Sequence, residues 1–372
     1  MSSWKADSSR MKTFFLTHIL SGLFLVFSSP VLAAPIVEAN PGASALTETY
    51  LARPDLQQFF PGEDRLGNAV MRKAGMLTLE DWARKYGYKE FPELLTPYAP
   101  FPPALNVIPG AVTPKLKPAA TFDFSSISAS SVFVVDMASR KVLMSNAASA
   151  PHPLASISKL FTAMVVLDRK PVLSRRYSIK KEDEVGGARL SVSKGDTLSL
   201  SELLNVTLIA SANNTANALA RSTGLSKPAF IEAMNVKAKS IGLTNTILVD
   251  PTGIEVGNMS TAREIAALAI EAFNRDQIRR ATTTSKYGLS LARGKHSLKN
   301  TNDVLNNDAN GIVVLGGKTG YLEESKWNLV VKMRDSSNHP ITVVVLGSES
   351  RVKSSQDAEK IGKWVWANYD WN

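Results

Sequence analysis

The sequence predicts an α+β fold in which helices cover an antiparallel sheet and a group of central helices forms a lobe of its own. Runs rich in β-branched residues lie at both ends of the main region, an α-rich stretch lies between them, and an amphipathic helix closes the chain. Strands that flank a helical centre pair most simply in one antiparallel sheet. A site is therefore expected in the crevice between the sheet and the helical lobe.

Local patterns predict the elements in chain order. A hairpin comes first, with strands at 131–136 and 141–144 joined by a turn at 138–140. Apolar residues at 157, 160, 161, 164 and 165 have the spacing of a helix packed on a core. Further helices are expected at 198–220, with one polar interruption, and at 228–240 and 261–273. Strands return at 311–315, 327–333 and 341–346, before a closing helix at 355–369.

The region before residue 120 is expected to stand apart from this fold. Lys12 precedes an apolar run from Phe14 to Phe27, and small residues then allow cleavage after Ala33. This pattern indicates a signal peptide over 1–34 and export to the periplasm or cell surface. Met11 is a possible start, and an uncleaved membrane anchor is the alternative. Residues 35–120 would form a helical appendage, with a short helix at 77–87 and a proline-rich linker at 97–118, leaving 121–372 as the main domain.

Composition excludes several classes of function. The 372 residues include no cysteine, so disulfides, thiol catalysis and thiolate metal sites are excluded. The formal net charge is +10, but zinc-ligand spacing, aromatic RNA-binding motifs and basic heptads are all lacking, so a nucleic-acid partner is not expected. An anionic cell-wall polymer, a membrane surface or solubility alone accounts for the charge.

Ser156 and Lys159 form the first candidate motif. Three residues apart at the start of the predicted helix, their side chains project from one side, within hydrogen-bonding reach. Lys159 is the only charge from Ile157 to Leu167, so its amine either finds a partner or loses its proton readily. A neutral amine beside a hydroxyl is a general base, and a helix N-terminus favours the alkoxide. Ser-x-x-Lys recurs at Ser178/Lys181, however, and alone it usually marks solvated surface.

Ser211-Ala212-Asn213 is the second motif and interrupts an apolar run. Polar residues in such a run are costly unless they serve a purpose. In a turn facing a cleft, Ser211 would relay a proton and Asn213 would hold a substrate amide; a polar helix contact is the alternative.

The third motif is Lys318-Thr319-Gly320, preceded by two further glycines at the end of a β-branched run. Lysine and threonine on a strand, with glycines that admit a substrate backbone, indicate a binding edge. A phosphate-binding loop is excluded because Ile312 stands where that loop requires glycine.

Together, Ser-x-x-Lys, Ser-x-Asn and Lys-Thr-Gly resemble the motifs of penicillin-binding proteins and class A β-lactamases. The likeness is greater to the serine-type D-alanyl-D-alanine carboxypeptidases and endopeptidases of low molecular mass, over about 130–350. The stretches 250–254, 258–263 and 300–302 are also similar to that group. The resemblance implies a β-lactamase/penicillin-binding-protein-like fold and a serine DD-peptidase that acts on peptidoglycan stem peptides, with β-lactams as covalent inhibitors and without a metal or other cofactor.

The resemblance also implies roles for single residues. Ser156 would attack the D-alanine carbonyl, Lys159 would take its proton, and Ser211 would protonate the leaving amine. Lys318, close to Lys159, is expected to lower the pKa of Lys159 by like-charge repulsion. Asn213 would bind a substrate amide, Lys318 and Thr319 would bind a carboxylate, and the strand at Gly320 and Tyr321 would bind the substrate backbone. The N–H groups of Ser156 and Tyr321 would form the oxyanion hole.

The sequence departs from the β-lactamase motifs at some positions, which makes some functions less expected than others. Ala212 stands where β-lactamases have aspartate, and no Glu-x-x-Leu-Asn element lies between Asn213 and Lys318, so a β-lactamase is less expected. The chain ends after its closing helix, so we expect no C-terminal β domain and only weak membrane association. The sequence lacks the Gly-x-Ser-x-Gly nucleophile elbow that a Ser-His-Asp hydrolase would need. A non-catalytic wall-binding protein is the remaining alternative.

The bond that is cut is the least constrained prediction. Glu323 and Glu324 follow the third motif, where they could contact an amine on the leaving side. An open, acidic cleft would favour a cross-linked substrate, so the sequence favours an endopeptidase, with a carboxypeptidase as the alternative.

Overall fold

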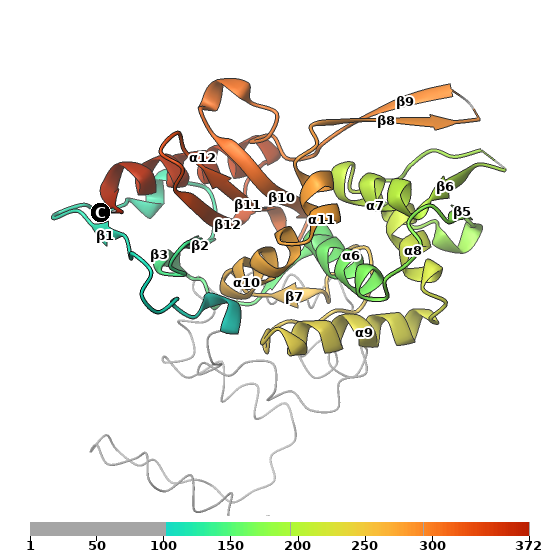
Figure 1. The fold of residues 1–372 in the computed structure, drawn as a ribbon, viewed down its shortest axis with the longest axis horizontal. Helices are drawn as coiled ribbons and strands as arrows, with labels where there is room; N and C mark the ends of the chain where they lie inside the picture. Colours follow the sequence, from blue (N-terminus) through green and yellow to red (C-terminus); the bar gives the residue numbers. More distant parts are fainter. Residues whose placement is uncertain (1–101, 194, 293, 372) are drawn as a thin grey trace, which may run out of the picture. The chain divides into compact units, whose positions relative to one another are not determined.

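The computed structural model describes residues 102–193, 195–292 and 294–371. The predicted signal peptide and the helix at 77–87 lie outside the described residues. Figure 1 shows a central sheet with α12 on one side and α10 on the other, and helices α6 to α9 grouped beyond the β10 edge. Among the described residues, no helix combines the length and the apolar character needed to cross a membrane.

The predicted antiparallel sheet is confirmed. In the described part of the chain it has five strands in the order β10-β11-β12-β2-β3, every neighbouring pair antiparallel. β10 is an edge strand, and it also contacts α11, the turn before α6, and Ser211 between α7 and α8. The strand predicted at 311–315 is longer than expected, because pairing with β11 carries it through the Lys-Thr-Gly motif. The bounds are β2 (Ser131–Asp136), β3 (Val142–Asn146), β10 (Val313–Leu322), β11 (Lys326–Arg334) and β12 (Pro340–Ser348).

Both faces of the sheet are buried, on different helices. Side chains of a strand alternate between its two faces, so neighbours in one strand pack in different cores. Val132 packs with Ile361 of α12 (Arg351–Asn368), whereas Phe133 belongs to the core that contains α10 (Ala262–Phe273). The closing helix begins before the predicted residue 355, because Ser350 caps it by accepting from the Lys353 N–H.

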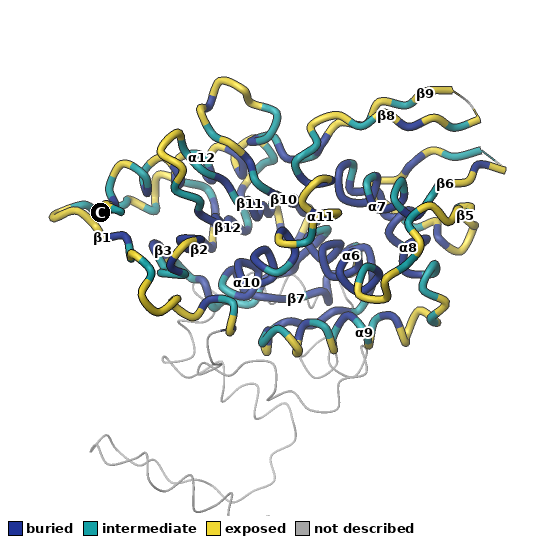
Figure 2. Tube along the Cα trace, in the orientation of Figure 1, coloured by how far each residue is buried: buried dark blue, intermediate teal, exposed yellow. Residues whose placement is uncertain are grey.

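The helical lobe is centred on α6 (Lys159–Asp168). This helix is buried over almost its whole length (Figure 2) and contacts α7, α8 and α9. The predicted interruption of the long stretch at 198–220 is confirmed: α7 ends at Ile209, α8 begins at Asn213, and Ser211 between them has a φ of +59°. The remaining bounds are α7 (Leu200–Ile209), α8 (Asn213–Ser222), α9 (Lys227–Ser240) and α11 (Asp276–Thr282).

A projecting hairpin was not predicted. It joins β8 (Lys286–Leu291) to β9 (Gly294–Lys299) above α7 (Figure 1). Alternation of polar and apolar residues over 286–291, followed by a glycine, is the signal that could have predicted it. Three two-stranded pairings complete the described elements: β1 (Lys115–Leu116) with β13 (Tyr369–Asp370), β4 (His152–Pro153) with β7 (Met259–Ser260), and β5 (Arg176–Ser178) with β6 (Thr197–Ser199).

The described end of the proline-rich linker packs on the main domain. Leu105 is 2% exposed and belongs to the larger hydrophobic core. Farther along, β1 pairs with β13, and Lys117 donates to the carbonyl of Ala367 at 2.9 Å. Residues 102–120 are therefore part of the packed fold rather than a free spacer over this stretch.

Candidate active site

The sequence predicted Ser156 in the first turn of an α-helix. In the structure Ser156 lies in a tight turn just before that helix. The turn is the 3-10 helix η4 (Ala155–Ser158), and α6 begins only at Lys159. Its start is held by tertiary contacts, because Leu154 donates its N–H to the Asn258 carbonyl at 2.7 Å. Ala155 has a φ of +49°, a strained conformation for a residue with a Cβ, directly before Ser156. The turn leaves Ser156 partly exposed while Lys159 is fully buried.

The predicted contact between Ser156 and Lys159 is present. Lys159 Nζ lies 2.6 Å from Ser156 Oγ, and it donates to Asn213 Oδ1 at 2.7 Å and to the Thr252 carbonyl at 2.5 Å. Burial lowers the pKa of Lys159 to about 7, and the charge of Asp250 opposes that shift. With a pKa near neutrality, a substantial fraction of the amine is unprotonated at neutral pH and can accept the hydroxyl proton of Ser156.

Ser211, between α7 and α8, contacts Lys318 of β10. Lys318 Nζ donates to Ser211 Oγ at 2.8 Å and to the Thr319 carbonyl at 2.9 Å. Burial, and then repulsion by Lys159, place the pKa of Lys318 well below its usual range. The predicted repulsion therefore depresses the pKa of Lys318 rather than that of Lys159. The lowered pKa of Lys159 results from burial, as its apolar surroundings in the sequence predicted.

Both the oxygen and the nitrogen of the Asn213 side-chain amide make hydrogen bonds. Its Oδ1 accepts from Lys159, and its Nδ2 donates to the Gly186 carbonyl at 2.7 Å. The Asn213 backbone N–H donates to the Ala188 carbonyl at 2.6 Å. The Nδ2 group carries two N–H donors, and the Gly186 carbonyl accepts from one of them.

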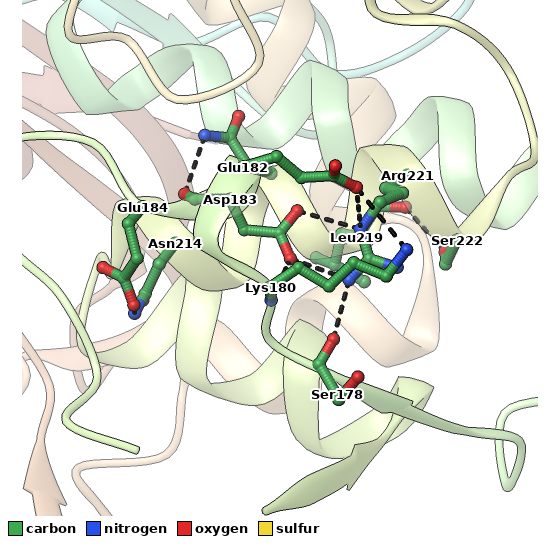
Figure 3. A network of polar contacts seen from close by, with 10 residues as sticks. Ser178, Lys180, Glu182, Asp183, Glu184, Asn214, Leu219, Arg221 and Ser222 are labelled. Atoms are coloured by element: carbon green, nitrogen blue, oxygen red, sulfur yellow. Dashed lines mark hydrogen bonds and ion pairs between the residues drawn. The ribbon is translucent and has the colours of Figure 1, made fainter. Parts of the chain in front are cut away.

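This segment is anchored to α8 by a polar network (Figure 3). Asp183 is 2% exposed and accepts two hydrogen bonds from Arg221, at 3.0 and 2.7 Å. Beside them, Asn214 donates to Glu184 at 3.1 Å. Asn214 also donates to the Leu190 carbonyl at 2.9 Å. The network fixes both ends of the loop that covers Asn213.

The turn η4 (Ala155–Ser158), called the nucleophile turn below, lies directly against the edge of β10. A Cβ at Gly320 would stand 2.7 Å from the Leu154 carbonyl oxygen and 3.2 Å from the Ser156 nitrogen, so glycine permits this approach. It brings the strand that carries Tyr321 next to the backbone nitrogen of Ser156, the other predicted oxyanion donor. Thr319 donates its hydroxyl to Thr301 Oγ at 2.7 Å. The Tyr321 ring is exposed and stacks on Trp327.

Some contacts differ from the predictions or were missed. Glu324 is 7% exposed, so of the two carboxylates predicted to line the leaving side only Glu323 is exposed to solvent. Thr301 and Asp250 lie in stretches singled out only by resemblance, without a role. Thr301 has its partner Thr319 on the distant strand β10, so no local pattern marks it. Asp250 accepts hydrogen bonds from nearby residues, but its effect on Lys159 depends on the tertiary fold.

The arrangement is suited to acyl transfer. It combines a partly exposed hydroxyl, a buried amine of low pKa in contact with it, a second serine–lysine pair, and a strand edge for an extended substrate. In the described ranges, His, Asp and Glu side chains do not gather in a group of three that could hold a metal ion.

Similarity to known proteins agrees with this chemistry. Residues 117–350 match the family model described as D-alanyl-D-alanine carboxypeptidase, peptidase family S11. The chain is 33% identical to a D-alanyl-D-alanine endopeptidase of Escherichia coli over 266 residues, which is 70% of this chain and 84% of that protein. It is 33% identical to an endopeptidase of the same name from Pseudomonas aeruginosa, over 64% of this chain and 77% of the relative.

A solved structure places the fold in the same group. A serine-to-alanine mutant of the Streptomyces K15 DD-transpeptidase superposes with a TM-score of 0.60 at 26% identity, covering 65% of this chain and 98% of that one. The fold is thus that of the penicillin-binding DD-peptidases, as the sequence predicted. With the family match spanning most of the chain, the protein belongs to the D-alanyl-D-alanine carboxypeptidase family and is a serine DD-peptidase.

Proposed function

We propose that the protein hydrolyses D-alanyl peptide bonds of peptidoglycan through an acyl-enzyme on Ser156. The contact of 2.6 Å between Ser156 Oγ and the amine of Lys159, whose pKa is about 7, is the observation that carries the proposal. Lys159 takes the hydroxyl proton as Ser156 attacks the D-alanine carbonyl. The oxyanion is stabilised by the backbone N–H groups of Ser156 and Tyr321.

The remaining residues serve the leaving group and substrate binding. Ser211, in contact with Lys318, passes a proton to the departing amine. Lys318 and Thr319 bind the carboxylate on the leaving side, beside Gly320. Asn213 binds a substrate amide through the Nδ2 group that now contacts Gly186. Water then hydrolyses the acyl-enzyme, and a β-lactam enters the same pathway but is released slowly.

We further propose that the substrate is the cross-link between two stem peptides. Three relatives at 33% identity are named endopeptidases, which supports this choice. The exposed carboxylate of Glu323 lies four residues beyond Thr319 and can attract a leaving-side amine. Trimming of a terminal D-alanine is the second candidate, supported by the description of the family model.

A covalent label tests the nucleophile. Purified protein should bind a fluorescent penicillin in a form stable to denaturing electrophoresis, and Ser156→Ala should abolish it. Ser158→Ala, two residues on in the same turn, is the matched control and should still be labelled. Label retained by the Ser156→Ala protein would place the nucleophile elsewhere.

Digests of defined substrates test the bond. Cross-linked dimers should be converted to monomers, whereas pentapeptide monomers should release little D-alanine, as followed by chromatography. Released D-alanine with intact dimers would identify a carboxypeptidase instead. Both substrates should remain intact with Ser156→Ala, which controls for contaminating hydrolases.

Such a substrate requires a location outside the cytoplasmic membrane. We propose export directed by residues 1–34, with cleavage after Ala33. N-terminal sequencing of protein recovered from an exporting host should show a start at Ala34. A start at residue 1 or 11 in membrane-bound material would favour an uncleaved anchor.

A further inference from the structure

We propose that Asp250 is a positioning residue, which holds the Thr252 carbonyl against Lys159 so that the lone pair of the amine is directed at the Ser156 hydroxyl. The inference rests on the proposed roles of Ser156 and Lys159. Asp250 lies in the loop between α9 and β7, far from the three motifs in the sequence.

The Asp250 carboxylate organises this loop. It is 2% exposed, and within the described residues it accepts five hydrogen bonds. Oδ1 accepts from the N–H and hydroxyl of Thr252, both at 2.6 Å, and from the Gly253 N–H at 2.9 Å. Oδ2 accepts from the Glu255 N–H at 3.0 Å and from Asn258 Nδ2 at 2.9 Å. These contacts fix the backbone on both sides of the Thr252 carbonyl.

The same loop is packed against the helix and turn that carry the reacting groups. Thr162 of α6 donates its hydroxyl to the Pro251 carbonyl at 2.6 Å. A Cβ at Gly253 would stand 2.0 Å from the Ala155 carbonyl oxygen, so the loop touches the nucleophile turn itself. The Thr252 carbonyl is thus placed relative to both Ser156 and Lys159.

The Thr252 carbonyl matters because the neutral amine of Lys159 has a fixed number of donors and a single lone pair. A neutral amine has two N–H donors and one lone pair. Asn213 Oδ1 and the Thr252 carbonyl can only accept, so they take the two N–H groups of Lys159. The lone pair is then left for the third neighbour, Ser156, whose O–H can donate. If the Thr252 carbonyl moved, an N–H could turn towards Ser156 and the base would be misdirected.

Asp250 also acts on Lys159 through its charge. The charged side chains that face Lys159 are Asp250 and, from β10, Lys318. Asp250 raises the pKa of Lys159 against the larger effect of burial. Removing the negative charge should therefore lower that pKa, although the geometry of the base would suffer. A residue with a merely structural role would not shift the pH profile of acylation.

The experiment measures the rate of Ser156 acylation by a fluorescent penicillin against pH. The acid limb is the part of this profile in which the rate falls with pH because Lys159 becomes protonated. Asp250→Asn should lower the plateau rate at higher pH about tenfold and move the acid limb to lower pH by about half a unit. Asp250→Glu, which keeps the charge but shifts the oxygens, should leave the limb in place while lowering the rate. Glu255→Gln is the matched control: it removes an exposed carboxylate of the same loop, and rate and limb should stay unchanged.

The outcomes separate this inference from the proposed function. A folded Asp250→Asn protein with the wild-type rate and limb overturns the inference, provided that Ser156→Ala loses the label. Label retained by Ser156→Ala overturns the proposed nucleophile instead. If Asp250→Asn does not fold, Thr252→Val decides, because it deletes one donor to Asp250 and keeps the carbonyl. An unchanged acylation rate in that variant overturns the inference, and a lower rate at an unchanged unfolding midpoint supports it.

Discussion

Buried ionisable side chains give the site its chemistry at the scale of single residues. Lys159 and Lys318 are at most 1% exposed, and their amines contact hydroxyl, carbonyl and amide oxygens. Such neutral acceptors compensate a full charge less well than water does, so burial lowers the pKa of both amines. His152, just before the nucleophile turn, is also buried and has its pKa lowered to about 4.

Acylation should depend on pH through Lys159. Below about 7 the amine is an ammonium and cannot accept a proton, so the rate should fall about tenfold per pH unit as the pH drops. Above that value the rate should level off. Stopped-flow acylation by a fluorescent penicillin between pH 5.5 and pH 9 measures this. Lys159→Met should be slower by on the order of 1000-fold and lose the acid limb. A flat wild-type profile would exclude Lys159 as the base.

Stability should depend on pH through His152. Its pKa is about 4 in the folded protein against 6.5 as a model value, so the unfolded chain binds more protons between these values. The free energy of unfolding should therefore fall as the pH drops through this window. Between pH 7 and pH 4.5 the loss due to His152 should be about 2 kcal/mol. Urea unfolding of the wild type and of His152→Gln compares the two losses, and equal losses would contradict the assignment.

The site is a junction of elements that approach unusually closely. The nucleophile turn is enclosed by the loop before β7 and by the edge of β10, which meet it at Gly253 and Gly320. Asn328 of β11 ties the turn to the sheet, since it donates to the Pro153 carbonyl at 2.9 Å and accepts from His152 at 3.0 Å. The reacting groups are thus fixed by backbone contacts on several sides.

Gly253→Ala should disturb this junction. The new Cβ would stand 2.0 Å from the Ala155 carbonyl oxygen, at a φ of +82° that disfavours a side chain. We expect a loss of more than about 2 kcal/mol in the free energy of unfolding and slower acylation. Gly224→Ala is the matched control, because its φ of +77° is similar but no atom lies within 4 Å of the new Cβ. Equal losses in both variants would mean that backbone strain alone is responsible.

Two hydrophobic cores, one on each face of the sheet, hold the described part of the molecule together. The larger core joins the helical lobe to one face, and the smaller core joins α12 to the other. Lys318 of β10 contacts Ser211 of the helical lobe, at the edge of the sheet that the larger core joins to the lobe. Leu105, from the segment before the predicted domain boundary at 120, is buried in that core.

Leu105→Ala should therefore destabilise the whole domain. Removing a fully buried leucine side chain costs about 2–4 kcal/mol, through lost burial and the cavity left behind. Leu116→Ala, in the same segment but 46% exposed, should cost well under 1 kcal/mol. Denaturant unfolding of the full chain measures both. A negligible effect of Leu105→Ala would show that 102–120 is not part of the cooperative unit.

The sequence by itself determined the fold class and the three motifs. Periodicity depends on neighbours along the chain, so most of the long strands and helices, including the break at Ser211, could be predicted from it. The contact of Ser156 with Lys159 was predictable for the same reason, because three residues of helix or 3-10 turn bring side chains to one side. Order and residue types of the motifs then indicated the family.

Tertiary structure alone decided the contacts between distant elements. Lys159 meets Asn213 across 54 positions and Lys318 meets Ser211 across 107, and no local pattern specifies such distances. The burial of Glu324, the pairing of Thr301 with Thr319 and the place of Asp250 behind Lys159 became known only from the packed fold. The complete burial of Lys159 belongs here too, because it depends on the elements that surround the side chain. Physically, sequence determines what a segment can form, whereas packing determines which groups lose water and which atoms they then meet.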